Sequence, residues 1–313
     1  MSLLSSIKEF FCPSKPNYEP RDKLEIEVSG ILPDKHVYSV EGSNLTVEVF
    51  HKNLSSERLK NIEETTNNTL KRCCRFFDVQ IDDYANFRIF MLENRDQLVE
   101  VLKKVHNFDP PKTWTGLTVN NNHPQYRELS KFSASDVFLF FNEKDGLLFN
   151  TPFSDDAIEY HVSHEFAHCI QFLKFYQPVI EGLSPKLQLP VFEGSADFIA
   201  CEKTCNGLEE NSICKTRFKQ GIDKVKSENL SLYNIYYGYY DQTSDNPYKT
   251  GIVVSKFLSD QHPKMIVKQF HCTGQGDYKC HHDLQSEIWE ISSSKEFADW
   301  LNKQYHSTDS MIL

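Results

Sequence analysis

The sequence predicts an α+β fold of two lobes, an α/β lobe followed by a helical lobe. In the first half of the chain, short segments of alternating apolar and polar residues are separated by segments with the apolar spacing of helices. The last third has helical spacing in several segments. A long helical segment from Asp155 to Gln177 lies between them, and we expect it to end the first lobe.

The domain boundaries follow from composition and periodicity. Residues 1–40 are rich in proline and are predicted to form an irregular N-terminal arm. Residues 41–178 are predicted to form the α/β lobe, and residues 179–313 the helical lobe.

The α/β lobe is expected to alternate strands and helices. The predicted strands are Leu45–Phe50, Phe87–Leu92, Gly116–Val119 and Asp136–Phe141. A first helix starts after the cap residue Ser55 or Ser56 and runs to about Phe77, and a second runs from about Arg95 to Val105.

The third helix of this lobe has the clearest start signal. Ser154 can cap it, and Asp155 and Asp156 favour the positive end of the helix dipole. The helix should end at Gln177, because Pro178 cannot continue it.

The helical lobe is expected to begin with a helix from about Phe192 to Cys201. Helical spacing recurs in Gly251–Leu258, Lys264–Phe270 and Glu296–Leu301.

The composition is that of a folded, acidic protein. Hydrophobic residues make up 39% of the chain and charged residues 25%, which is ordinary for a globular protein. The 34 basic and 44 acidic residues give a formal net charge of −10, which disfavours nucleic-acid binding. No apolar run is long enough to cross a bilayer, so no integral membrane segment is expected. The sequence leaves the oligomeric state open.

The cysteines and the N-terminal segment bear on the cellular compartment. Lys8 and Glu9 interrupt a weakly apolar start, so no signal peptide is evident, and a cytoplasmic location with reduced thiols is favoured. Two clusters among the nine cysteines and four Asn-x-Ser/Thr triplets favour secretion instead. The compartment therefore stays open.

The long helix contains the sequence His164-Glu-Phe-Ala-His168. Residues four apart face the same way, about 6 Å apart along the axis, so both imidazoles can bind one ion. Zinc favours this class of ligand. Glu165 lies on the adjoining face, where it can act as general base on a water held by that ion without binding the ion itself. The alternative is two partly exposed histidines on an amphipathic helix.

A third protein ligand is expected from the segment Phe192-Glu-Gly-Ser-Ala-Asp197. Catalytic zinc has three protein ligands and one open position. Glu193 is the candidate ligand, and Asp197 lies one turn further if the segment is helical. Asp197 can then accept the outer ring N–H of one zinc histidine and fix its tautomer. The alternative for Glu193 is a solvated carboxylate at the start of a helix.

The pairing of His-Glu-x-x-His with a later Glu-x-x-x-Asp resembles the gluzincin clan of zinc peptidases. More narrowly, the segments from His164 to Gln171 and from Phe192 to Phe198 look like the catalytic core of bacterial collagenase-type peptidases and their aminopeptidase-like relatives. The resemblance covers about residues 150–270. It implies a zincin-like two-lobed fold, with an α/β upper lobe, the metal-binding helix as cleft floor and a helical lower lobe.

The same resemblance suggests a residue that stabilises the oxyanion. Tyr248 is near the start of a segment similar to a later helix of collagenase-like chains, in which a Tyr faces the zinc. By that resemblance Tyr248 could stabilise the oxyanion. The neighbouring alternatives are Tyr236, Tyr237, Tyr239 and Tyr240.

Other histidines are predicted to lie outside the catalytic site. His161 shares the helix face but lies about 10 Å from His168 along the axis, too far to bind the same zinc. Residues 271–272 and 280–282 have the residue types of a second metal site, but a disulfide or a loop of reduced thiols is preferred. Gln171 and Lys174 stand where a metzincin would have Gly and His, which excludes that class.

We therefore expect a zinc-dependent metalloprotease that hydrolyses peptide bonds of a protein or peptide substrate, with a zinc-bound water activated by Glu165. The resemblance to zincins also implies an edge strand above the zinc that aligns the substrate, and residues 136–141 or 116–119 are the candidates. The alternatives are a zinc hydrolase of a non-peptide amide and a non-catalytic binding protein with the same fold.

Overall fold

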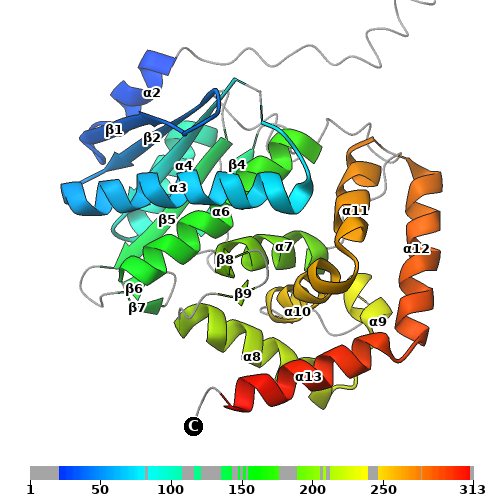
Figure 1. The fold of residues 1–313 in the computed structure, drawn as a ribbon. Coiled ribbons are helices and arrows are strands. Elements are labelled where there is room, and N and C mark those ends of the chain that lie inside the picture. The colour runs from blue at the N-terminus through cyan, green and yellow to red at the C-terminus, as the bar shows by residue number, and fades with distance from the viewer. Residues whose placement is uncertain are drawn as a thin grey trace, which may run out of the picture.

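The computed structural model describes the chain outside its two ends and several internal segments. The described residues are 21–81, 84–107, 116–120, 135–142, 147–148, 151–152, 154–175, 189–204, 207–208, 212–238, 246–275 and 277–310. They form a sheet with helices on both faces, followed by a group of helices (Figure 1). The predicted α+β architecture of an α/β lobe and a helical lobe is confirmed.

One mixed sheet organises the first lobe. Its strands are β1 (Asp34–Ser39), β2 (Leu45–His51), β3 (Ala85–Leu92), β4 (Gly116–Asn120), β5 (Ser135–Asn142), β6 (Leu147–Leu148) and β7 (Thr151–Pro152). Strands β2, β3 and β5 are parallel, and β1 is antiparallel to β2. Strand β4 is antiparallel to β5, on the side of β5 opposite to β3. Among the described strands, β4 therefore lies at an edge of the sheet and β5 lies inside it.

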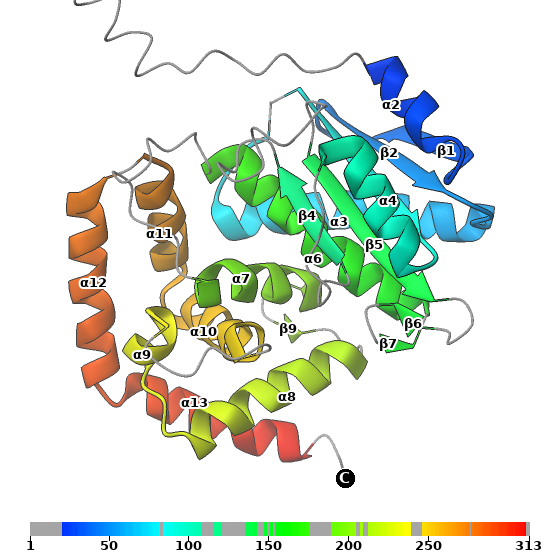
Figure 2. The same cartoon turned by 180° about the vertical axis from the view of Figure 1, so that it is seen from behind.

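Helices cover both faces of the sheet. They are α2 (Arg21–Val28), α3 (Ser56–Phe77), α4 (Arg95–His106) and α6 (Asp155–Phe175). Helices α3 and α6 lie on one face, and α2 and α4 on the other (Figures 1 and 2). Successive side chains of a strand point to opposite faces, so Val49 packs in the core with α3 and α6 while Phe50 packs in the core with α2 and α4.

The second lobe is helical. Its helices are α7 (Leu189–Cys201), α8 (Ser212–Ser227), α9 (Leu232–Tyr236), α10 (Asn246–Gln261), α11 (Pro263–Gln275), α12 (Tyr278–Ser293) and α13 (Glu296–Ser310), with a short hairpin of β8 (Glu202–Thr204) and β9 (Gly207–Leu208) after α7. No described helix combines the length and the apolar character needed to cross a membrane.

The N-terminal arm differs from the prediction. Residues 21–40 were expected to be irregular, but they contain α2 and β1, so the prediction is wrong for this part. Leu24 and Val28, one turn apart in α2, and Leu32, which follows the helix, are buried in the core with α4. Their burial stabilises this segment although prolines lie nearby. Residues 1–20 lie outside the described residues.

Helix α7 is longer than predicted. It begins at Leu189 rather than at about Phe192, because Pro190 is well suited to the first turn of a helix, where backbone N–H groups have no partner within the helix. Helix α6 is described as far as Phe175, so its predicted end lies outside the described residues.

Two glycines allow α7 and α10 to approach to backbone contact. A Cβ atom on Gly194 would lie 2.1 Å from the carbonyl carbon of Gly251, and one on Gly251 would lie 2.2 Å from the carbonyl oxygen of Pro190. No side chain fits at either position. The contact fixes α7 against α10 at the turn of helix that carries Glu193.

Two disulfides lie among the described residues of the helical lobe. Cys201 at the end of α7 is bonded to Cys214 in α8, and Cys272 in α11 is bonded to Cys280 in α12. The second disulfide agrees with the preference against a further metal site at these cysteines, because both thiols are used in the bond.

A buried group of three ionisable side chains connects β3, β5 and α4. Arg88 donates hydrogen bonds of 2.5 and 2.7 Å to the two carboxylate oxygens of Asp136, and His106 Nε2 lies 2.6 Å from one of these oxygens. Asp136 has no exposed surface. Burial raises the pKa of Asp136, but Arg88 and His106 lower it by more, so its net pKa falls below the ordinary value.

We expect Asp136→Asn to reduce the free energy of unfolding by about 3–5 kcal/mol, because it removes the carboxylate that faces the buried Arg88. The folded-state pKa of Asp136 is lowered, so its contribution is complete above the unfolded pKa of about 3.9 and is lost as the pH falls through the folded pKa. In urea unfolding, the difference in the free energy of unfolding between wild type and Asp136→Asn should therefore be constant above about pH 4 and smaller below it. Glu41→Gln, which breaks an exposed pair, is the control and should cost less than about 1 kcal/mol. Equal losses in the two variants would contradict this account.

Candidate metal centre

Helix α6 carries two histidines on one face at the border of the two lobes. Ser154 caps it as predicted, since its Oγ accepts a hydrogen bond of 3.2 Å from the backbone N–H of Ala157. Nearly every residue from Ala157 to Gln171 is buried, because α6 packs against the sheet, α3 and α7. His164 and His168 are one helical turn apart on the side that faces α7.

Three side-chain atoms from α6 and α7 converge on one point. His164 Nε2 lies 3.1 Å from His168 Nε2, and Glu193 Oε2 lies 3.1 Å from His168 Nε2 and 3.4 Å from His164 Nε2. Ligands held tetrahedrally at about 2.0–2.1 Å from one zinc ion are separated by about 3.3 Å. The spacing of the three atoms therefore fits a single zinc ion, and within the described part of the chain these residues form the group that could hold a metal.

The outer ring nitrogens of both histidines face acceptors. His164 Nδ1 has no hydrogen bond of regular geometry, and Asp197 Oδ1 is 2.7 Å from it. His168 Nδ1 lies 2.7 Å from Gln171 Oε1. A neutral imidazole that donates from Nδ1 has its lone pair on Nε2. Two lone pairs and a carboxylate oxygen then face one another, an arrangement that requires a cation between them.

The surroundings also favour a positive charge at this point. Burial lowers the pKa of His164, but Asp197 and Glu193 raise it by more, to about 10. Burial raises the pKa of Glu193, while His168 and His164 lower it by more, so it falls well below its usual range. A proton would supply the positive charge in the absence of a metal, and a divalent cation supplies more.

Asp197 is the centre of a buried network that the sequence only partly predicted. It lies beside His164 as expected, and it also accepts a hydrogen bond from the Tyr160 hydroxyl and one of 3.3 Å from Arg217 Nη1. The Arg217 guanidinium lies over the Tyr160 ring, 5.1 Å from its centre. Tyr160 precedes His164 by one turn, a spacing that could have revealed it. Arg217 comes from α8, and no local signal links it to the motif.

Glu165 is held by a residue of the sheet. The Thr118 hydroxyl of β4 donates a hydrogen bond to the Glu165 carboxylate, and Glu165 is buried. Sequence reasoning identified the strand but not this side chain. Of the two candidate edge strands, β4 is the one at the sheet edge and next to Glu165, whereas β5 is flanked by β3 and β4.

Tyr248 lies beside the first histidine. Its ring centre is 6.2 Å from that of His164. Negative charge on Glu193 raises the pKa of Tyr248, and burial adds to the effect, so its hydroxyl stays protonated and able to donate. Of its competitors, Tyr236 is buried and donates its hydroxyl to Gln269 in α11. Tyr239 and Tyr240 lie outside the described residues.

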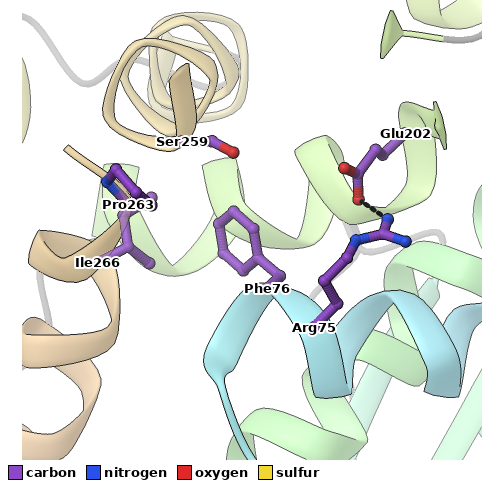
Figure 3. A pocket seen from close by; sticks show the side chains of 6 residues that line it. All are labelled: Arg75, Phe76, Glu202, Ser259, Pro263 and Ile266. Carbon is purple, nitrogen blue, oxygen red and sulfur yellow. Dashed lines mark hydrogen bonds and ion pairs between the residues drawn. The ribbon is translucent and has the colours of Figure 1, made fainter. Parts of the chain in front are cut away.

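A separate small pocket lies near the other end of α7. Its lining residues are Arg75, Phe76, Glu202, Ser259, Pro263 and Ile266 (Figure 3). Glu202 forms an ion pair of 2.7 Å with Arg75 there. Because the Glu202 carboxylate is already paired with a guanidinium, this pocket does not offer a set of converging metal ligands like the His-His-Glu group.

Residues 150–300 match the family of peptidases described as collagenase, Peptidase_M9. The matched segment is just under half of the chain and contains the His-His-Glu group. The predicted resemblance to collagenase-type gluzincins is confirmed over this segment, and the match supports the predicted enzyme class, a metallopeptidase. The family is zinc-dependent, which agrees with the predicted cofactor.

No curated protein is significantly similar to the sequence. Among solved structures, the chain is similar to an aminopeptidase N family protein from Idiomarina loihiensis, with a TM-score of 0.41 and 12% sequence identity. The similarity covers 86% of this chain and 44% of that protein, so the chain spans less than half of its length.

Proposed function

We propose that the chain is a zinc-dependent peptidase in which His164, His168 and Glu193 hold the metal. The observation that carries the proposal is the set of three ligand atoms within 3.4 Å of one another, inside the segment that matches the collagenase family. Asp197 orients His164 in this proposal, because its carboxylate is the nearest acceptor for the outer ring nitrogen.

Glu165 is the proposed general base and acid. Zinc bound at this site would act as a Lewis acid and lower the pKa of a bound water toward about 7. The Glu165 carboxylate takes a proton from the attacking water and returns it to the leaving amine. Thr118 orients this carboxylate through the hydrogen bond from its hydroxyl. Tyr248, which stays protonated, donates a hydrogen bond to the developing oxyanion.

The substrate is proposed to be an extended peptide. Strand β4 is an edge strand among those described and lies next to the catalytic carboxylate, so a peptide paired with β4 would pass beside Glu165. A zinc hydrolase of a non-peptide amide would use the same residues without needing this strand. The position of β4 favours the peptidase.

Removal of the metal tests the proposal. The purified chain should bind one zinc ion, and peptide cleavage should be lost on chelation and recovered with one equivalent of zinc. Zinc at about 100 times its Kd should also add about 2.7 kcal/mol to the free energy of unfolding. A mixture of peptides of diverse sequence, analysed by mass spectrometry for new termini, provides the activity readout. A protein that binds zinc but cleaves no peptide would contradict the peptidase, and one that binds no zinc would contradict the whole proposal.

A further inference from the structure

Gln171 connects the second candidate ligand to the backbone beside the third. Its side chain is buried, with 1% of its surface exposed. Its Oε1 accepts a hydrogen bond of 2.7 Å from His168 Nδ1, and its Nε2 donates hydrogen bonds of 3.1 Å to the Phe192 carbonyl and 2.9 Å to Ser195 Oγ. Phe192 and Ser195 lie on either side of Glu193 in α7. The Gln171 amide therefore connects α6 to α7.

The partners of the amide determine which way it faces. A backbone carbonyl oxygen can only accept, so the amide group that faces Phe192 must be the NH2. Ser195 donates its own hydrogen to the Val191 carbonyl at 2.7 Å, and its oxygen is therefore able to accept the second N–H of the amide. Both amide hydrogens have acceptors, which leaves the amide oxygen facing His168.

The orientation of the amide in turn determines the tautomer of His168. The Gln171 amide oxygen can only accept, so His168 Nδ1 must donate and the imidazole lone pair lies on Nε2. That atom points towards His164 Nε2 and Glu193 Oε2. The two histidines are therefore fixed by different groups, His164 by a carboxylate and His168 by a neutral amide that also binds α7.

We propose that Gln171 is a positioning residue for the metal, fixing the tautomer of His168 and its distance from Glu193 together. This inference rests on the proposed function, because it assumes that His168 and Glu193 hold zinc. Loss of a group that orients a metal-binding histidine typically lowers metal affinity about 10–100-fold. Gln171 should contribute at this level although it touches neither the metal nor the substrate.

The test compares zinc affinity in three variants of the full chain. Gln171→Met has nearly the same shape without the amide, and we expect its zinc Kd to rise about 10–100-fold. Gln171→Glu keeps an acceptor facing His168 and, when protonated, an O–H that can donate to the Phe192 carbonyl, but it loses the second amide hydrogen that Ser195 accepts. Its zinc Kd should therefore rise by less than that of Gln171→Met. Gln269→Leu is the matched control: Gln269 is also buried and accepts a hydrogen bond from Tyr236, but it lies in α11.

Zinc Kd is measured by competition with a chromophoric chelator, and the stability of the zinc-free proteins by urea unfolding. Gln269→Leu should lose stability while its zinc Kd stays at the wild-type value. The inference is overturned if Gln171→Met binds zinc as tightly as wild type, if Gln171→Glu is as weak as Gln171→Met, or if Gln269→Leu weakens zinc equally. These outcomes leave the proposed function intact, since wild type still binds zinc. A wild-type chain that binds no zinc overturns both.

Discussion

A Glu165→Gln protein is expected to keep stoichiometric zinc and to lose about 10²–10⁴-fold in the rate of peptide cleavage. Glutamine has the shape of glutamate, and its amide oxygen can still accept the hydrogen bond that Thr118 donates. It cannot take a proton from the attacking water. The loss should therefore appear in kcat rather than in KM, because the proton is transferred only in the chemical step.

The control for this variant lies on the same helix. Glu159 is partly exposed, lies 3.5 Å from Arg72 and is not one of the three candidate ligands. Glu159→Gln should keep both zinc and turnover. Zinc content is measured by elemental analysis and kcat with a peptide identified by cleavage mapping. Equal turnover in Glu165→Gln and wild type would remove Glu165 from the mechanism, and a Glu165→Gln protein without zinc would place it among the ligands.

The parts of the fold that could be predicted are those that depend on residues close together in the sequence. The start of α6 follows from the Ser154 cap and the acidic residues after it, and the convergence of His164 and His168 follows from the geometry of one helical turn. The parallel strands were recognisable from their apolar patterns. Their order in the sheet was not, because pairing between distant strands leaves no periodic signal in either strand.

The parts that could not be predicted depend on contacts between distant elements. Arg217 reaches Asp197 from α8, and Thr118 reaches Glu165 from β4. A single arginine or threonine in a surface-like segment gives no indication of such a contact. The choice between two edge strands was likewise decided by the order of strands in the sheet. Gln171 was visible in the sequence, but the role that we propose for it depends on its three hydrogen bonds, which the sequence does not reveal.

The position of Glu193 combines both kinds of information. The motif marks it as a ligand candidate, but a glutamate in α7 reaches the histidines only if α7 lies in the correct position relative to α6. The contact between Gly194 and Gly251, which leaves no room for a Cβ atom, holds α7 closely against α10 and helps to define that position. Gly194, next to the candidate ligand, therefore contributes to the candidate metal site through its backbone rather than through a side chain.

Glu193→Ala is expected to raise the zinc Kd by more than about 100-fold, beyond the 10–100-fold typical of groups that only orient a ligand. Two imidazoles would remain, one fewer protein ligand than a catalytic zinc site has. At a zinc concentration 100 times the wild-type Kd, zinc adds about 2.7 kcal/mol to the stability of wild type, but a 100-fold weaker variant gains only about 0.4 kcal/mol. Thermal or urea unfolding with and without zinc measures this difference directly.

The matched control for Glu193→Ala is Glu202→Ala. Glu202 is a buried glutamate directly after α7, and its carboxylate is paired with Arg75 in the separate pocket (Figure 3). Its loss should lower the stability of the zinc-free protein and leave the gain on adding zinc unchanged. This comparison separates a ligand from a structural carboxylate, because only the ligand changes the zinc-dependent part of the free energy of unfolding. If Glu193→Ala keeps stoichiometric zinc and the full zinc-dependent gain, Glu193 is not the third ligand.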